Sequence, residues 1–212
     1  MRSILKNNRS FFIPYVLFLI IGAIVLIANS KSETHLEFNK FHTSFFDLFF
    51  YYITFLGDVV TTVLIVIIML CVKYRYAVII AVSNIVATCF TQILKHTIFS
   101  DVVRPKLYFQ GVKDLYFVPG VENYLYNSFP SGHTTCAFSL YLSLAMIVKN
   151  MRLKFLFFTV ALLVGYSRIY LSQHFLEDVY GGSVVGVVTT LLIFYFIQRK
   201  QHAWMEGSIM KR

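Results

Sequence analysis

Charged side chains are scarce in this sequence. Asp, Glu, Lys and Arg make up 14% of the 212 residues, whereas hydrophobic residues make up 58%, and the mean hydropathy is +0.69. An ordinary soluble domain carries roughly a quarter charged residues. The shortage of charge therefore excludes a soluble globular domain and predicts a protein that lies in a membrane.

Cysteine and clustered metal ligands are also few. The three cysteines, Cys71, Cys89 and Cys136, each lie inside an apolar stretch and lack the pair spacing of a zinc or redox site. Four histidines have no metal-ligand spacing around them: His35, His42, His96 and His202. The sequence therefore implies neither a metal nor another cofactor.

A continuous basic face is missing too. The net charge is +9, but the basic residues are scattered between long apolar runs, whereas nucleic-acid binding needs a clustered basic surface. We expect no nucleic-acid partner, and no feature implies an obligate protein partner.

Long apolar runs, in contrast, are abundant. Six of them can be read as membrane spans, at about residues 11–29, 55–72, 76–94, 132–148, 155–172 and 179–196. A secretory signal is the alternative for the first, but its apolar run exceeds the usual ~7 to 15 residues. The second has Asp58 near its outer end, and the aromatic run from Phe45 to Tyr52 either extends it or lies along the interface.

Lys and Arg predict the orientation of these spans. They gather in four segments: Arg2 to Arg9, Lys73 to Arg75, Lys149 to Lys154, and Arg199 to Arg212. Two predicted spans separate each segment from the next, so all four segments fall on the same side of the membrane. Positively charged loops tend to stay in the cytoplasm. The sequence thus predicts an all-α, six-helix membrane bundle, a single domain over residues 1–212, with both termini cytoplasmic. The loop at residues 96–131 then faces the other side, and loops of this size usually carry function.

Phe129-Pro130-Ser131-Gly132-His133 opens the fourth predicted span. Unpaired backbone N–H groups and the positive end of the helix dipole favour an anion at such a helix start. The segment therefore predicts a phosphate site. A proline-capped helix with a satisfied histidine is the plainer alternative.

A second polar segment runs from Ser167-Arg168 to His174 and Asp178, between the fifth and sixth spans. If the turn is helical, His174 and Asp178 share a face, so that the carboxylate can hold one ring nitrogen while the other points at substrate. A nucleophilic histidine needs this arrangement. Arg168 brings a guanidinium suited to phosphate, although an ion pair with Asp178 or Glu177 is the alternative.

Taken in order, these segments resemble the type 2 phosphatidic acid phosphatase superfamily, in its membrane-bound lipid phosphatase branch. The family motifs read K-x6-R-P, P-S-G-H and S-R-x5-H-x3-D, and the second and third are complete here. In the first motif, Arg104-Pro105 matches, but eight residues separate Lys95 from Arg104 instead of six. Lys106 or Lys113 could therefore take part of the role of Lys95.

The resemblance implies a metal-independent hydrolase that acts at the non-cytoplasmic helix ends. His174 would attack phosphorus, Asp178 would orient its ring, and His133 would protonate the leaving oxygen and later activate water. The residues implied to hold the phosphate are Lys95, Arg104, Ser131, Gly132 and Arg168. The partner would be a lipid phosphate in the bilayer.

Compact loops are typical of a bacterial enzyme, which places the protein in an inner membrane with its active site in the periplasm. Undecaprenyl diphosphate ranks first as substrate, lipid A second, and phosphatidylglycerol phosphate is a further candidate. Three other functions stay open: a lipid phosphotransferase that uses the same phosphohistidine, a transporter or receptor that binds anionic lipid, and a haloperoxidase. The last is disfavoured because the related oxidases are soluble.

Overall fold

The computed structural model describes residues 2–200 and 202–210. Over these residues the chain folds into helices and forms no strand. The helices, in chain order, are α1 (Arg2–Asn7), α2 (Arg9–Ala28), α3 (Lys31–Phe38), α4 (Ser44–Ile53), the short 3-10 helix η1 (Thr54–Gly57), α5 (Val59–Val72), α6 (Tyr74–Thr97), α7 (Pro105–Tyr108), α8 (Gly132–Ile147), α9 (Met151–Tyr170), α10 (Leu176–Gln198) and a second 3-10 helix, η2 (Ala203–Glu206). The all-α prediction is confirmed for this part of the chain.

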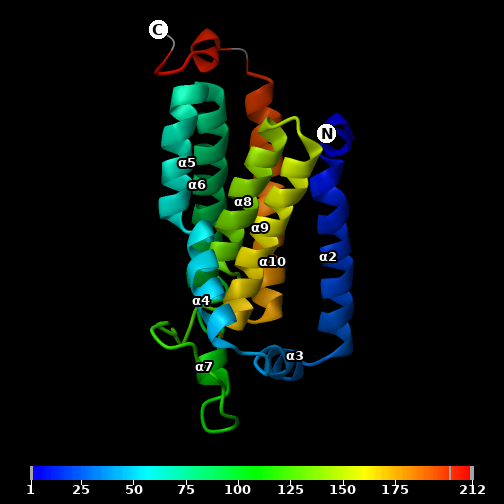
Figure 1. The fold of residues 1–212 in the computed structure, drawn as a ribbon, viewed down its shortest axis with the longest axis vertical. Coiled ribbons are helices and arrows are strands. Elements are labelled where there is room, and N and C mark those ends of the chain that lie inside the picture. The colour runs from blue at the N-terminus through cyan, green and yellow to red at the C-terminus, as the bar shows by residue number, and fades with distance from the viewer. Residues whose placement is uncertain (1, 201, 211–212) are drawn as a thin grey trace.

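The long helices run along one axis and form an elongated bundle (Figure 1). Both chain ends lie at one end of the bundle, together with η2 and the turn between α8 and α9. The opposite end carries α3, α7 and the long loop between α6 and α8. This second end is where the predicted catalytic motifs meet.

Helix α8 is the centre of the bundle. It has 16 residues, of which 12 are buried, because α6, α9 and α10 surround it. Two glycines of α10 allow the close approach: a Cβ at Gly182 would lie 2.6 Å from the carbonyl oxygen of Ser131, and one at Gly186 would lie 2.6 Å from that of Thr135. Small residues let helix backbones approach in this way in membrane proteins. The contact sets the start of α10 against the start of α8.

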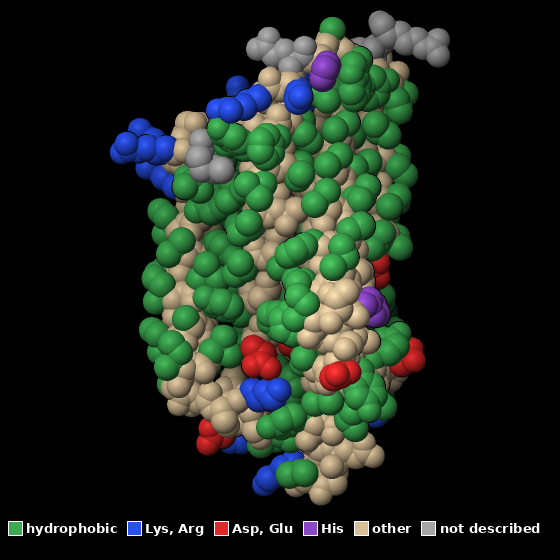
Figure 2. Space-filling model, turned by 180° about the vertical axis from the view of Figure 1, so that it is seen from behind, with side chains coloured by type: hydrophobic (Ala, Val, Ile, Leu, Met, Phe, Trp, Pro, Cys, Tyr) green, Lys and Arg blue, Asp and Glu red, His purple; other side chains and the backbone are tan. Residues whose placement is uncertain are grey.

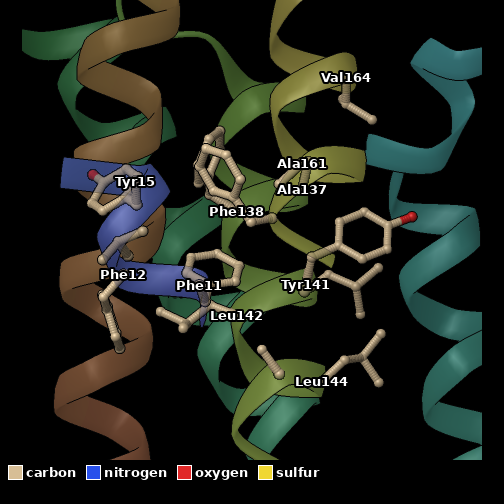
Figure 3. Packing of buried hydrophobic residues seen from close by; sticks show 14 of the residues in the cluster. Phe11, Phe12, Tyr15, Ala137, Phe138, Tyr141, Leu142, Leu144, Ala161 and Val164 are labelled. Carbon is tan, nitrogen blue, oxygen red and sulfur yellow. The ribbon is translucent and has the colours of Figure 1, made fainter. Parts of the chain in front are cut away.

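An aromatic core fixes α2 to the rest of the bundle (Figure 3). The ring of Phe11 meets that of Phe158 on α9 at 5.7 Å, and Tyr15 meets Phe138 on α8 at 5.6 Å. Such ring pairs add about 0.5–1.5 kcal/mol each beyond the buried area. The first predicted span is therefore an integrated helix of the bundle.

Each of the six predicted spans coincides with a long helix to within four residues at either end. The span predicted at 55–72 also includes most of the 3-10 helix η1, which precedes α5. Asp58 caps α5 by accepting a hydrogen bond from the Val60 N–H, and the chain bends by 54° between Ser44–Gly57 and Val59–Val72. The chain is therefore bent at Asp58, because the aspartate starts a new helix, and the aromatic run from Phe45 to Tyr52 lies in α4 before the bend.

Four helices are each long and apolar enough to cross a membrane, namely α2, α6, α9 and α10, and the bent pair would make a fifth crossing. The surface of the bundle fits this reading. Apolar side chains cover its middle, whereas Lys and Arg lie toward its two ends (Figure 2). Exposed apolar surface on this scale belongs in lipid. Lys211 and Arg212, two of the basic residues used to predict orientation, lie outside the described residues.

Candidate active site

The starts of α8 and α10 and the end of α9 are joined by backbone hydrogen bonds. The N–H of Ser131 donates to the carbonyl oxygen of Asp178 over 2.9 Å, and the N–H of His174 donates to the carbonyl oxygen of Arg168 over 3.1 Å. The two polar segments singled out in the sequence are therefore held against each other by the fold.

His174 and Asp178 form a buried pair. Nδ1 of His174 lies 3.2 Å from Oδ2 of Asp178, and the two side chains are 2% and 0% exposed. With Nδ1 held by the carboxylate, Nε2 is the ring nitrogen left to attack an electrophile. The i, i+4 spacing predicted this contact. The residues do not share one helix, because α10 begins at Leu176 and His174 lies in the turn before it.

Other donors hold Asp178 in place. Its Oδ2 also accepts hydrogen bonds from the hydroxyl of Ser128, over 2.5 Å, and from the N–H of Phe175, over 2.9 Å. Such donors stabilise the charged form of a carboxylate. Asp178 can therefore orient the ring of His174 and balance a positive charge that develops on it.

The environment of His174 keeps its imidazole neutral. Burial lowers the pKa of His174 well below its usual range, and the positive charges of Arg104, Lys95 and Arg168 lower it further. A histidine must be unprotonated to act as a nucleophile. The surroundings thus supply the reactive form at neutral pH.

Arg168 lies buried beside this pair. Its guanidinium donates to the hydroxyl of Thr54 over 2.6 Å and to Oε1 of Gln173 over 3.3 Å, and its Nε is buried without a hydrogen-bond partner among the described residues. No ion pair of Arg168 with Asp178 or Glu177 is found among the described residues. Glu177 pairs with Lys31 at 3.4 Å, and Asp178 pairs with His174 at 3.2 Å.

Arg104 and Lys95 complete a group of three cations. Nζ of Lys95 donates to the backbone oxygen of Asn127 over 2.7 Å, and Arg104 donates to the same oxygen over 3.4 Å. Arg104 also donates to the carbonyl oxygen of Gln173 over 3.2 Å. The two extra residues in the first motif therefore do not remove Lys95 from the site.

The partners of these three cations, Lys95, Arg104 and Arg168, share one property. Every hydrogen bond found for their side chains in the described residues goes to a neutral oxygen, and no ion pair with a carboxylate is found there. Buried charges are costly unless they are paired. Lys95 and Arg168 are buried and Arg104 is half-buried. Such a group of unpaired cations favours an anion, and phosphate is the anion that arginine holds best in two-point contacts.

The Pro130–His133 segment caps the start of α8 and also offers N–H groups to an anion. Ser131 is the N-cap of α8, where its hydroxyl accepts from the N–H of Thr134 at 3.4 Å, and its own N–H is taken by Asp178. Gly132 has open space around the position of a Cβ. The N–H groups of Gly132 and His133 lie in the first helical turn, where no intrahelical acceptor exists. These two N–H groups are therefore donors suited to an anion, whereas the backbone N–H of Ser131 is not, because it already donates to Asp178.

His133 lies within reach of the same charges. Its imidazole interacts electrostatically with Arg168, Arg104 and Lys95, the same three cations that act on His174. His174 is paired with Asp178 and is suited to attack, whereas His133 lies in the first turn of α8 and is suited to transfer a proton.

Three residues of the site were not predicted from the sequence: Gln173, Thr54 and Ser128. Gln173 carried a signal, because it precedes the predicted nucleophile directly. Its Oε1 accepts from Arg168 and lies 3.5 Å from Nη1 of Arg104. No sequence signal pointed to Thr54 or Ser128. The bend at η1 brings Thr54 to the site, and the loop between α6 and α8 brings Ser128 there.

Lys106 and Lys113 lie elsewhere. Both are exposed and line a surface hollow of the outer loop that also contains Asp114. Among the described residues no group of three or more His, Cys, Asp or Glu side chains is arranged to hold a metal ion.

The family follows from the sequence profile. Residues 76–202 match the PAP2 superfamily, and this match covers more than half of the chain. The chain therefore belongs to the PAP2 superfamily, as the motifs predicted, and with its long apolar helices it is an integral membrane protein.

Curated relatives match over shorter stretches. The chain is 41% identical over 69 residues to undecaprenyl-diphosphatase BcrC of Bacillus subtilis, an alignment that covers 32% of this chain and 35% of that protein. It is 34% identical over 80 residues to lipid A 4'-phosphatase of Porphyromonas gingivalis, over 38% of this chain and 34% of that protein. The chain thus spans about a third of the length of these relatives.

Solved structures share the fold along most of the chain. Aquifex aeolicus LpxE has a TM-score of 0.68 at 23% identity, over 77% of this chain and 93% of that one. The PAP2-type phosphatidylglycerolphosphate phosphatase of Bacillus subtilis has a TM-score of 0.66 at 22% identity, over 93% and 98%.

Proposed function

We propose that this protein is a membrane lipid phosphatase, a hydrolase that needs no metal and works through a phosphohistidine. The observation that carries the proposal is the buried His174–Asp178 pair beside three cations that bind only neutral oxygens in the described residues. Nucleophile, orienting carboxylate and anion site are thereby in one place.

In the first step, Nε2 of His174 attacks phosphorus, and the bond between phosphorus and the lipid oxygen breaks. His133 donates a proton to that oxygen, so that the lipid leaves as a neutral alcohol or as the shorter phosphate. Asp178 balances the positive charge on the His174 ring. In the second step His133 takes a proton from water, the water oxygen bonds to phosphorus, and the bond between phosphorus and Nε2 of His174 breaks, so that inorganic phosphate leaves and His174 is neutral again.

Positively charged groups stabilise both transition states. Arg168, Arg104 and Lys95 would hold the phosphoryl oxygens, joined by the N–H groups of Gly132 and His133. Fixed donors in a water-poor site are usually the largest single contribution to such catalysis. In this proposal the cations take the part that a divalent metal plays in other phosphatases.

We also propose that the chain makes six membrane crossings as one domain. Helix α8, with 16 residues, is about 24 Å long and thus shorter than the roughly 30 Å apolar layer. It is enclosed by other helices, however, so it need not match the lipid thickness itself. Two chain ends at the same end of the bundle (Figure 1) require an even number of crossings, which favours six over five.

The distribution of basic residues supports an orientation with both termini in the cytoplasm and the active site in the periplasm of a bacterial inner membrane. A phosphate site at the outer helix ends can accept a headgroup while the lipid tail stays in the bilayer. Relatives that act on undecaprenyl diphosphate, lipid A and phosphatidylglycerol phosphate support a lipid substrate. We rank undecaprenyl diphosphate first and lipid A second.

The test is release of inorganic phosphate in EDTA by the protein purified in detergent. The panel is undecaprenyl diphosphate, lipid A, phosphatidylglycerol phosphate and phosphatidic acid, each with wild type, His174→Ala and the matched surface variant Lys106→Ala. We expect release from one lipid, its loss in His174→Ala and its retention in Lys106→Ala. Activity in a folded His174→Ala protein contradicts the mechanism. Transfer of label only to an added lipid alcohol would identify a phosphotransferase instead.

A further inference from the structure

A second group of cations lies at the other end of the bundle, far from the candidate active site. It surrounds a cavity of about 660 Å³ between α1, the start of α2, the α8–α9 turn and the end of α10. Four basic side chains line it: Lys6, Arg9, Lys149 and Lys154. Amide and hydroxyl groups supply the remaining polar lining, and no carboxylate is among the lining residues.

The positive charge of this cavity is not neutralised within the described chain. Lys154 is buried, and its Nζ donates to the carbonyl oxygen of Asn7 over 2.6 Å and to Oδ1 of Asn8 over 2.7 Å. No ion pair is found there for any of the four basic residues. Glu206, an acidic residue at the same end of the molecule, is engaged by Lys73 and Arg75. The positive charge of its lining thus suits the cavity to an anion.

An apolar groove continues from this cavity along the outside of the bundle. Its volume is about 460 Å³, and it shares Arg9 and Met151 with the basic cavity. From there it runs over Ile13, Pro14 and Phe155, on the apolar surface that faces lipid. A free phosphate ion would use only the basic cavity. A groove joined to it fits a ligand that has both an anionic head and an apolar chain.

We propose that this cavity and groove together bind an anionic phospholipid. The headgroup phosphate lies among Lys6, Arg9 and Lys149, and one acyl chain lies along Ile13 and Phe155. Basic pockets between membrane helices at the interface recognise anionic headgroups in this manner. The site is separate from the phosphatase proposal, because none of its residues belongs to the candidate active site.

A bound lipid would also tie together parts of the chain that meet only at this end. The headgroup would bridge Lys6 on α1 and Lys149 in the α8–α9 turn, and a ligand that binds only the folded protein stabilises it. We therefore expect the melting temperature in detergent to rise when an anionic phospholipid is added.

The test measures retained lipid by native mass spectrometry of the detergent-purified protein. The probes are dioleoylphosphatidylglycerol, dioleoylphosphatidylcholine and inorganic phosphate. The variant Lys6→Gln/Arg9→Gln/Lys149→Gln removes three charges from the lining, and Arg2→Gln/Arg199→Gln/Lys200→Gln removes three from the same end outside it. Arg2, Lys6, Arg9, Lys149, Arg199 and Lys200 are all exposed, so both variants are expected to fold.

We expect wild type to retain phosphatidylglycerol in preference to phosphatidylcholine. The lining variant should bind phosphatidylglycerol roughly a hundredfold more weakly, since each basic residue near an anionic lipid surface contributes about fivefold, and the control variant should keep its binding. Equal loss in the two variants, or equal retention of the two lipids, overturns the proposal. Displacement of the lipid by millimolar phosphate would show a small-anion site instead.

A photoreactive phosphatidylglycerol provides a second measurement that needs no variant. With its reactive group on the acyl chain, we expect crosslinks in wild-type protein to peptides that contain Ile13 and Phe155. Crosslinks spread over the whole apolar surface would contradict a defined site.

Discussion

The hydroxyl of Ser128 donates a hydrogen bond to Oδ2 of Asp178 over 2.5 Å. Both side chains are fully buried, with 0% exposure. The same carboxylate oxygen faces Nδ1 of His174, so Ser128 fixes the group that in turn fixes the nucleophile. A loop residue 50 positions away in the chain thereby orients the reacting ring.

Replacing Ser128 by Ala should therefore lower turnover by about ten- to a hundredfold, because a hydrogen bond to a charged group contributes roughly 1.5–3 kcal/mol. KM should change little, since Ser128 does not point at the phosphate site. Steady-state phosphate release gives both constants. Ser100→Ala, which removes an exposed hydroxyl that contacts Asp101, is the matched control. A Ser128→Ala enzyme with wild-type kcat would show that Asp178 needs no such support.

Gln173 joins the two arginines of the site. Its Oε1 lies 3.3 Å from Arg168 and 3.5 Å from Arg104, and its Nε2 donates to the carbonyl oxygen of Glu122 over 2.7 Å and to Asn123 over 2.6 Å. A neutral amide oxygen thus occupies a position between two guanidinium groups and ties them to the outer loop.

In Gln173→Glu a permanent negative charge would compete with phosphate for both arginines. We expect inhibition by vanadate, which mimics phosphate, to weaken by at least roughly tenfold, the effect of about 1.4 kcal/mol. Gln110→Glu makes the same change of charge on the exposed outer loop and should leave inhibition as in wild type. Equal vanadate inhibition in the two variants would mean that Gln173 does not face the anion.

Lys95 and Lys106 offer a direct comparison of two lysines. Lys95 is buried and shares the oxygen of Asn127 with Arg104, whereas Lys106 is exposed. Loss of one fixed donor to a transition state costs about a hundredfold or more in kcat, so Lys95→Ala should lose this much and Lys106→Ala almost nothing. The reverse order would move the first-motif role to the outer loop.

Much of the site was predictable because its chemistry is local in sequence. His174 and Asp178 are four residues apart, and Pro130 to His133 form one helix start, so spacing alone placed them. The bend in the second span could not be predicted in the same way. Asp58 is visible near the outer end of this span, but the sequence does not reveal that it caps a new helix and bends the chain by 54°.

Thr54 and Ser128 could not be predicted from the sequence for a different reason. Thr54 reaches Arg168 across 114 positions of the chain, through the bend at η1. Ser128 reaches Asp178 because Gly182 lets α10 press against the start of α8. Neither residue type is distinctive, and their roles exist only once the helices have packed.

Helix α3 carries a buried histidine next to the site. The ring of His35 stacks on Phe109 at 5.7 Å and meets Phe175 edge-on at 5.2 Å, and its Nε2 lies 3.3 Å from the hydroxyl of Ser172. Burial lowers the pKa of His35 to about 4. The folded protein therefore keeps this ring neutral where an unfolded chain would protonate it.

This difference predicts how stability depends on pH. Above pH ~6.5 both states are neutral, and between about 6.5 and 4 only the unfolded chain binds the proton, so stability falls as pH falls. At pH 5 the loss from His35 is about 2 kcal/mol. We expect the melting temperature in detergent to drop between pH 7.5 and 5 less in His35→Phe than in wild type. His202→Phe, at an exposed position, should behave as wild type; identical slopes in all three proteins would show that His35 is not the group responsible.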